Sequence, residues 1–178
     1  MDHQNIRFHN VEELEPVEGG WLLRRVGAAA RARISPGVQE NCFATGIELR
    51  FTMPDGAVDL LLKTIPQAEA ATAHILFGSF QGGWEYSSKN IGADVTRIHI
   101  EYPAKLATLR RITAEKQLAF APEVVRVVLP YVPVIFAGVE GRTALPAADG
   151  SNTSSYYNSA LFGQETIFPN APGQIGRA

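Results

Sequence analysis

The histidines are the side chains of this sequence best suited to acid–base chemistry, and all four lie in its first hundred residues. Serine and cysteine hydrolases need a nucleophile, a histidine base and usually a carboxylate that orients the base. His9 has Glu12 and Glu13 close in sequence, but no serine or cysteine motif accompanies it, so a surface or pairing role is favoured over catalysis. The four are His3, His9, His74 and His99.

A nucleophile turn is the next feature that a hydrolase requires, and residues 150–153 place a serine between small and polar residues. Ser151 does not follow a hydrophobic strand that could hold it rigidly, and no histidine occurs downstream. The sequence also has no glycine-rich phosphate loop that opens a helix and no His/Asp/Glu cluster at metal-ligand spacing. We therefore expect no complete catalytic set in this chain, no metal and no other cofactor.

Two groups of residues could instead bind a ligand. Arg97, His99 and Glu101 alternate with apolar residues, which predicts one polar face of a strand, as sugar-binding modules use. Trp84 and Tyr86 follow two glycines in a predicted loop, where exposed rings could stack on a sugar or an acyl chain. Two plainer roles stay open: a solvated strand face for the first group, and core packing for Trp84, which is the role favoured for that residue.

Short strands separated by turns must position these residues. In residues 46–53, Glu48 and Arg50 alternate with apolar side chains, which predicts a sheet with one face on the core and one in water. Residues 54–56 (Pro-Asp-Gly) give the clearest hairpin signal. The pattern predicts a mainly all-β fold, an antiparallel jelly-roll-like β-sandwich with one or two short helices. The eight predicted strands cover residues 6–11, 21–26, 46–53, 57–65, 73–80, 95–102, 124–129 and 134–139.

The remaining segments divide the chain into a domain and a tail. Residues 26–34 and 105–118 have the composition or the apolar stripe of short helices. Residues 1–145 form the predicted β-sandwich domain. Residues 146–178 are rich in proline, glycine and serine, yet apolar enough to pack on the domain or on a missing catalytic domain.

Composition limits the partners and the compartment. The chain has 178 residues, a formal net charge of −2 and 46% hydrophobic residues, so no excess of positive charge would draw it to nucleic acid. It has no secretion signal and no apolar run of about 18 residues, from which we expect a cytoplasmic protein with no membrane partner. Its single cysteine, Cys42, can form neither an internal disulfide nor a structural zinc site, and a buried, inert thiol is expected.

Several short segments, in the same order along the chain, resemble segments of the N-terminal accessory domain of bacterial two-domain GDSL/SGNH hydrolases, a family of esterases and lipases. The resemblance covers about residues 6–145. It is carried by residues 8–14 (Phe-His-Asn-Val-Glu-Glu-Leu), 20–26 (Gly-Trp-Leu-Leu-Arg-Arg-Val), 46–51 (Gly-Ile-Glu-Leu-Arg-Phe), 120–127 (Phe-Ala-Pro-Glu-Val-Val-Arg-Val) and 136–141 (Phe-Ala-Gly-Val-Glu-Gly).

The resemblance implies a jelly-roll-like sandwich, similar to carbohydrate-binding modules, that is followed by a catalytic α/β domain. The family's catalytic domain opens with a Gly-Ser-Ser-type nucleophile block and closes with an Asp-x-x-His pair. Here residues 150–153 match the block poorly and the Asp-x-x-His pair is absent. The resemblance therefore implies a fold and an association with a serine ester hydrolase, and it transfers no catalytic residue.

Three functions follow from these observations. The leading one is a non-catalytic domain of a GDSL/SGNH-type acyl-esterase or lipase, with the catalytic domain in cis or in trans. Such a domain either binds the acyl-ester or glycan part of the substrate or helps to form the substrate cleft. The second is a free-standing, lectin-like carbohydrate-binding module that uses Trp84, Tyr86 and the strand face around His99. The third is an interaction domain whose apolar tail segment, residues 156–168, pairs with a second copy in a homo-oligomer or with a catalytic partner.

Overall fold

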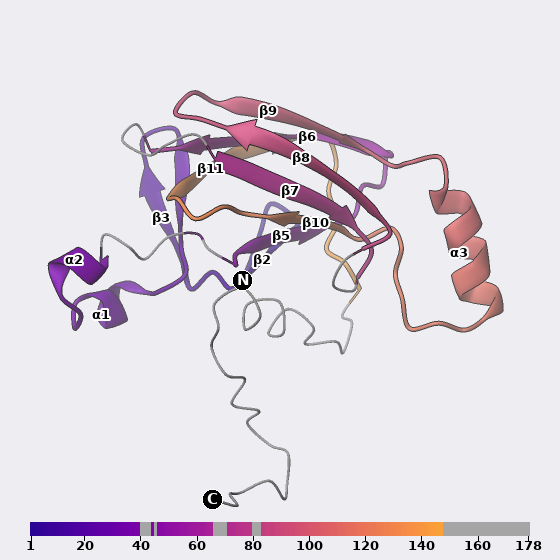
Figure 1. Ribbon diagram of the computed structural model, residues 1–178, viewed down its shortest axis with the longest axis horizontal. Helices are drawn as coiled ribbons and strands as arrows, with labels where there is room; N and C mark the ends of the chain where they lie inside the picture. The colour runs from indigo at the N-terminus through magenta and orange to yellow at the C-terminus, as the bar shows by residue number, and fades with distance from the viewer. Residues whose placement is uncertain (40–43, 45, 66–70, 80–82, 148–178) are drawn as a thin grey trace, which may run out of the picture.

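Two antiparallel sheets pack face to face in the computed structural model of this chain (Figure 1). The structure describes residues 1–39, 44, 46–65, 71–79 and 83–147. The chain passes from one sheet to the other at most of its connections, as in jelly-roll sandwiches. The predicted antiparallel β-sandwich is thus confirmed.

The first sheet has six strands in the order β1-β2-β5-β10-β7-β8. Its strands are β1 (Asp2–His3), β2 (Ile6–His9), β5 (Glu48–Phe51), β10 (Val125–Val128), β7 (Ala71–Phe77) and β8 (Glu85–Ile91). The second sheet has five strands in the order β3-β4-β11-β6-β9. Its strands are β3 (Glu13–Val17), β4 (Gly20–Arg24), β11 (Val134–Glu140), β6 (Ala57–Thr64) and β9 (Thr96–Glu101).

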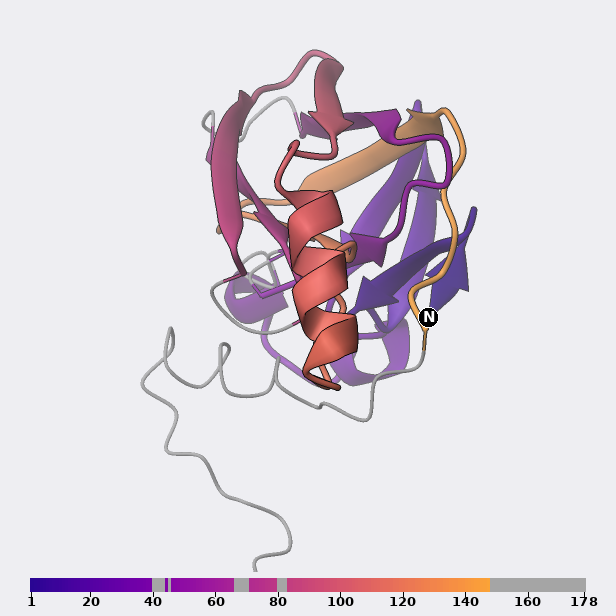
Figure 2. The same ribbon diagram turned by 90° about the vertical axis from the view of Figure 1, so that its right-hand side faces the viewer.

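In the described part of the chain, three short helices lie outside the sandwich: α1 (Ala28–Arg31), α2 (Pro36–Gln39) and α3 (Leu106–Glu115). The first two lie at one end of the molecule, and α3 stands at the other end, where it links β9 of the second sheet to β10 of the first (Figures 1 and 2). Helices α1 and α3 fall within the two predicted helical segments, whereas α2 was not predicted. None of the described helices is both long enough and apolar enough to cross a bilayer.

Strict alternation of side chains builds the core between the sheets. Along β6, every second residue is buried, beginning with Val58, and the intervening residues are partly exposed. The facing side chains of the first sheet include Phe8, Leu49 and Val127, which are fully buried. Trp21, which we assigned to the core, packs against this cluster.

All eight predicted strands are present, and three further strands were missed. Strand β1 has two residues, and β3 contains Pro16, which favours an edge position. The third, β8, was predicted as part of a loop because its residues are polar at almost every position. Only Ile91 of β8 is buried, so the strand lacks the alternation that identifies a half-buried strand.

Two finer predictions about the strand at residues 46–53 are wrong. Glu48 and Arg50 do not face water, because their exposed fractions are 2% and 7% and they form ion pairs inside the fold. Residues 53–56 do form a turn, in which Gly56 N donates to Met53 O at 3.1 Å. This turn joins β5 of one sheet to β6 of the other, so it is a crossing between sheets rather than a hairpin.

Some predictions concern residues outside the described part of the chain. They are the buried thiol of Cys42, the turn around Ser151, and the tail from residue 148 onward.

Candidate functional site

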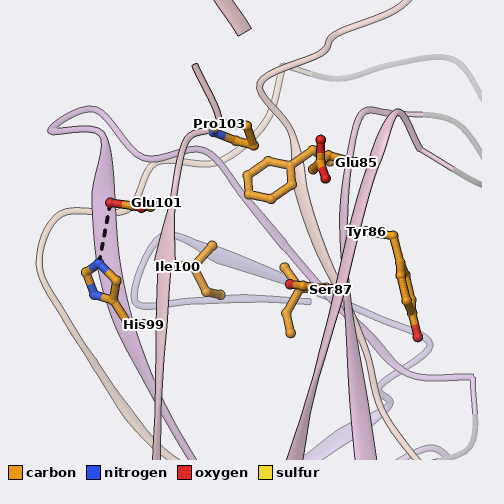
Figure 3. Close-up of a pocket in the computed structure, with 9 residues that line it drawn as sticks. Glu85, Tyr86, Ser87, His99, Ile100, Glu101 and Pro103 are labelled. Carbon is orange, nitrogen blue, oxygen red and sulfur yellow. Dashed lines mark ion pairs between the residues drawn. The ribbon is translucent and has the colours of Figure 1, made fainter. Parts of the chain in front are cut away.

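A groove opens between the two sheets at the edge where β8 and β9 end their respective sheets. Its volume is about 350 Å³, near the lower end of the range for small-molecule sites. The buried side chains of Ile75, Phe77 and Ile100 form an apolar floor. Polar residues surround it. The full lining is Ile75, Phe77, Glu85, Tyr86, Ser87, His99, Ile100, Glu101 and Pro103 (Figure 3).

Strand register determines which side chains of β8 can reach the groove. Glu85 lies opposite Phe77, and Ser87 lies opposite Ile75, so both polar residues are on the face of the first sheet that looks toward the second sheet. Tyr86 lies between them in sequence and points to the outer face, on the far side of β8 from Ile100 (Figure 3). The inner face of β8 is therefore polar above an apolar floor.

On β9, Ile100 points inward while His99 and Glu101 form the outer rim of the groove. His99 Nδ1 lies 2.8 Å from Asp59 Oδ1. Its Nε2 lies 3.9 Å from Glu101 Oε2, and Figure 3 marks this pair with a dashed line. Hydrogen bonds from His99 and Arg97 hold the pKa of Asp59 below its usual range. Carboxylates thus flank both ring nitrogens of this exposed imidazole.

Arg97 lies two residues before His99 and outside the groove lining. Its guanidinium donates to Asp59 Oδ2 at 2.9 Å and to Glu140 Oε1 at 2.8 Å. These hydrogen bonds, with that to Glu140 first, raise the pKa of Arg97, which stays charged. Arg97 therefore links β9, β6 and β11 on the exposed face of the second sheet, and it acts as a positioning residue for the Asp59–His99 pair.

Of the five residues proposed from sequence, three lie on the lining of the groove: Tyr86, His99 and Glu101. Trp84 is only partly exposed. Its Nε1 donates to Pro122 O at 2.8 Å and its ring packs on Phe77, which is the core-packing role that the sequence favoured for this residue. Arg97 completes the polar face of β9 without reaching the groove.

Tyr86 is the exposed aromatic ring at this edge, with an exposed fraction of 56%. Its ring stacks on that of His74 at a centroid distance of 5.7 Å, and its hydroxyl lies 2.8 Å from His74 Nδ1. The stacking fixes the orientation of the ring, and the free face remains accessible to a ligand.

Sequence analysis missed the contribution of β8 and of the floor. Glu85 and Ser87 carry no recognisable motif, and their position depends on a strand that has no apolar alternation. A search of the sequence for a polar strand that follows a glycine-rich turn could have identified β8 as a candidate part of the binding site. Ile75 and Phe77 appeared only as core residues of a strand, because nothing in the sequence shows where the sandwich is left open.

The side chains around this groove offer groups that can bind a ligand. The two histidines closest to the groove are engaged by Tyr86 and by Asp59, and Ser87 lies across the gap from the rim histidine (Figure 3). Within the described residues, no group of three His, Cys, Asp or Glu side chains could hold a metal ion. An apolar floor with a hydroxyl and two carboxylates at its rim suits an uncharged ligand that has an apolar part and hydroxyl or amide donors.

A second polar cluster lies within the first sheet, away from the groove. Glu48 accepts hydrogen bonds from Arg126 at 3.0 Å and from Arg50 at 2.8 Å. Burial would raise the pKa of Glu48, but the hydrogen bonds and charges of the two arginines outweigh that effect and lower it. Burial, assisted by the charge of Arg50, also lowers the pKa of nearby His9 to about 4. We regard this cluster as structural.

Comparison with known proteins gives a likeness of fold and no family. No family model matches the chain, and no curated protein matches it. Among solved structures, the chain is similar to the salicylyl-acyltransferase SsfX3 from a tetracycline biosynthetic pathway, with a TM-score of 0.56 and 12% sequence identity. The match covers 81% of this chain and 40% of that chain, so this chain spans less than half the length of that protein. At this identity the likeness concerns the fold alone.

Proposed function

We propose that this chain is a non-catalytic β-sandwich domain that works with a GDSL/SGNH-type acyl-esterase or acyltransferase catalytic domain, in cis or in trans. The observation that carries the proposal is the fold likeness to two-fifths of an acyltransferase chain. It agrees in kind with the sequence resemblance to the accessory domain of ester hydrolases. Ester hydrolysis transfers an acyl group to water and acyltransfer moves it to another acceptor, so the two reactions are closely related.

The groove between β8 and β9 is the part of the domain that we assign to substrate binding. Its floor of Ile75, Phe77 and Ile100 suits an acyl chain or an aromatic acyl group, because burial of apolar surface is favourable and non-directional. Ser87 and Glu85 at the rim can accept hydrogen bonds from hydroxyl groups of the substrate. A volume of about 350 Å³ holds one such group rather than a whole glycoconjugate.

A methyl-detected NMR titration of the full chain tests the binding role. Phenyl butyrate is the probe, and ¹³C-labelled isoleucine methyl groups are the reporters. We expect shifts at Ile75 and Ile100, while Ile6 and Ile135, which do not line the groove, serve as internal controls. Shifts at the control residues alone, or at none, would remove the groove as the binding site.

Hydrolysis measurements test the non-catalytic role separately. We expect the chain alone to leave 4-nitrophenyl butyrate intact at the rate of buffer. Hydrolysis that the Ser151→Ala substitution abolishes would overturn the proposal. The gene read in frame beyond codon 178 then locates the catalytic partner: a strand, a Gly-Ser-Ser turn and a later Asp-x-x-His place it in cis, and a stop codon directs the search to a partner in trans.

A lectin-like module is the second candidate, and the exposed ring of Tyr86 favours it. A stacked aromatic ring beside a polar strand face is a common way to bind a sugar. The Tyr86→Ala variant should lose affinity for oligosaccharides on a glycan array at least tenfold, whereas Tyr131→Ala, which removes an equally exposed ring elsewhere, should not. If Tyr86→Ala, Tyr131→Ala and Trp84→Ala all bind the oligosaccharides with the same affinity, the sugar site is not at this position.

A further inference from the structure

Strand β8 is a long edge strand whose outer backbone edge has no neighbouring strand among the described residues. Such an edge is a template for another strand, and proteins usually protect it. Two of the other three edges are protected, because β1 has only two residues and β3 contains Pro16. The remaining edge, β9, has six residues and no proline. Strand β8 has seven residues and no proline, and residues 86–90 are all exposed.

The charges of β8 have no counterpart within the described part of the chain. Glu85 and Lys89 form no ion pair with the described residues, and an extended strand keeps residues four apart in sequence separated by about 13 Å. Strand β9, the neighbouring edge, differs because Arg97 is already bound to Asp59 and Glu140. Among the described edge strands, β8 is therefore the one in which neither charged residue has an ion pair.

We propose that β8 pairs antiparallel with β8 of a second copy of this chain, so that the first sheet continues across a two-fold axis. An axis perpendicular to the sheet keeps each face of the sheet on its own side, so residues of equal parity must lie opposite one another. With Ser87 on the axis, Glu85 of each copy lies opposite Lys89 of the other copy, and Tyr86 lies opposite Ser88. Both charges of β8 are then paired, twice per dimer.

The alternative registers are less favourable. A shift that places Ser88 on the axis sets Glu85 opposite Ile91 and leaves both charges unpaired. A further shift places Lys89 opposite itself, and like charges directly opposite each other destabilise a sheet. Charge complementarity therefore selects the register centred on Ser87.

This pairing would complete the groove. Glu85, Ser87 and Lys89 are on the face of β8 that looks toward the second sheet, and the first two line the groove. The second copy would bring its own Lys89 next to Glu85, which adds a cation to a rim that otherwise has two carboxylates. The dimer would thus carry two grooves side by side at its junction. This inference does not depend on the proposed catalytic partner.

Sedimentation velocity of the full chain tests the pairing. We expect a dimer for the unmodified chain, and at least a tenfold weaker association for Glu85→Lys and for Lys89→Glu, each of which sets like charges opposite one another. The double variant Glu85→Lys/Lys89→Glu restores opposite charges and should dimerise as the unmodified chain does. Glu101→Lys changes the same charge on β9 and is the matched control. A monomer at all concentrations, or a dimer that neither single variant weakens, overturns the proposal.

Disulfide cross-linking tests the register independently. In a Cys42→Ser background, Ser87→Cys places two thiols opposite each other on the axis, at a spacing that a disulfide can bridge. Ser88→Cys is the control, because residue 88 of one copy lies opposite Tyr86 of the other copy. The two cysteines at position 88 are then not directly opposite each other. Cross-linking of the first variant alone is the expected result. Cross-linking of the second variant alone, or of neither, overturns the register.

Discussion

Arg126 binds both carboxylate oxygens of Glu48 across two neighbouring strands of the first sheet, with Nε to Oε2 and Nη2 to Oε1 distances of 3.0 Å each. Both side chains are almost fully buried. Arg50 shares the same carboxylate through its Nε, while its Nη2 has no hydrogen-bond partner among the residues that the structure describes. A buried charge that loses its partner is strongly destabilising, so this pair gives the first prediction.

Replacement of Arg126 by Met should lower the free energy of unfolding by about 3–5 kcal/mol, because Glu48 loses the partner that binds both of its oxygens. Urea denaturation followed by circular dichroism measures the change. Arg97→Met, which removes exposed ion pairs that water and salt screen, should cost much less. If Arg126→Met does not fold, Arg126→Lys keeps the charge and should still be less stable than the unmodified chain. Equal costs for Arg126→Met and Arg97→Met would contradict the prediction.

Stability should fall as the pH is lowered from about 6.5 to 4, because His9 has a pKa of about 4 in the folded chain and near 6.5 when unfolded. In that interval the unfolded state binds a proton that the folded state does not. Above pH 6.5 His9 is neutral in both states and contributes no pH dependence. His9→Gln should flatten the melting temperature between pH 4 and 6.5, measured by calorimetry. A profile unchanged by the substitution would assign the loss to other groups such as Glu48.

The hydroxyl of Tyr102 bridges two segments: it donates to Glu123 O at 2.8 Å and accepts from Met53 N at 2.9 Å. Tyr102→Phe should cost about 1–3 kcal/mol of unfolding free energy, because a partly buried N–H and C=O lose their partner. Tyr86→Phe removes a hydroxyl at an exposed position and should cost less than about 1 kcal/mol. Chemical denaturation compares the two variants, and the reverse order would refute this role of Tyr102.

Gly20 begins β4 with a φ of +147°, where a Cβ would overlap the carbonyl oxygen of Phe136 on the neighbouring strand. Gly20→Ala should therefore destabilise the fold by about 2 kcal/mol or more, since neither backbone can move away without losing ladder hydrogen bonds. A Cβ at Gly92 meets no atom within 4 Å, so Gly92→Ala should change stability by less than about 1 kcal/mol. Thermal unfolding of both variants gives the comparison.

Strands that bury one face could be predicted from the alternation of apolar and polar residues. The strand β8 and the burial of Glu48 could not, because neither follows that alternation. Strand β6 alternates apolar and partly exposed residues and was placed within one residue of its end. Strand β8 is polar at almost every position and mostly exposed, because it lies at the edge of its sheet, so its sequence lacks the alternation that identifies a strand. Glu48 was expected in water, because a single strand does not reveal that an arginine will lie on its neighbour.

The residues of the candidate site could be predicted only in part. His99 and Glu101 could be predicted because polar and apolar residues alternate along β9. Tyr86 could be predicted because an aromatic residue next to a turn is often exposed and able to bind a ligand. Glu85 and Ser87 could not, since their role comes from the strand order that places β8 and β9 at the same edge. Trp84 shows the converse: an aromatic ring near a turn can equally be tied to the core, here through Pro122.

The order of strands also decides when the fold can form. Strand β10 fills the middle of the first sheet between β5 and β7, and β11 fills the middle of the second sheet between β4 and β6. Both arrive late in the chain, at Val125–Val128 and Val134–Glu140. In a nascent chain that lacks them, each sheet is divided into two parts, one on each side of the gap that the missing strand will fill. Folding on the ribosome must therefore wait for these last strands, and until then unpaired strands on both sides of each gap need protection from aggregation.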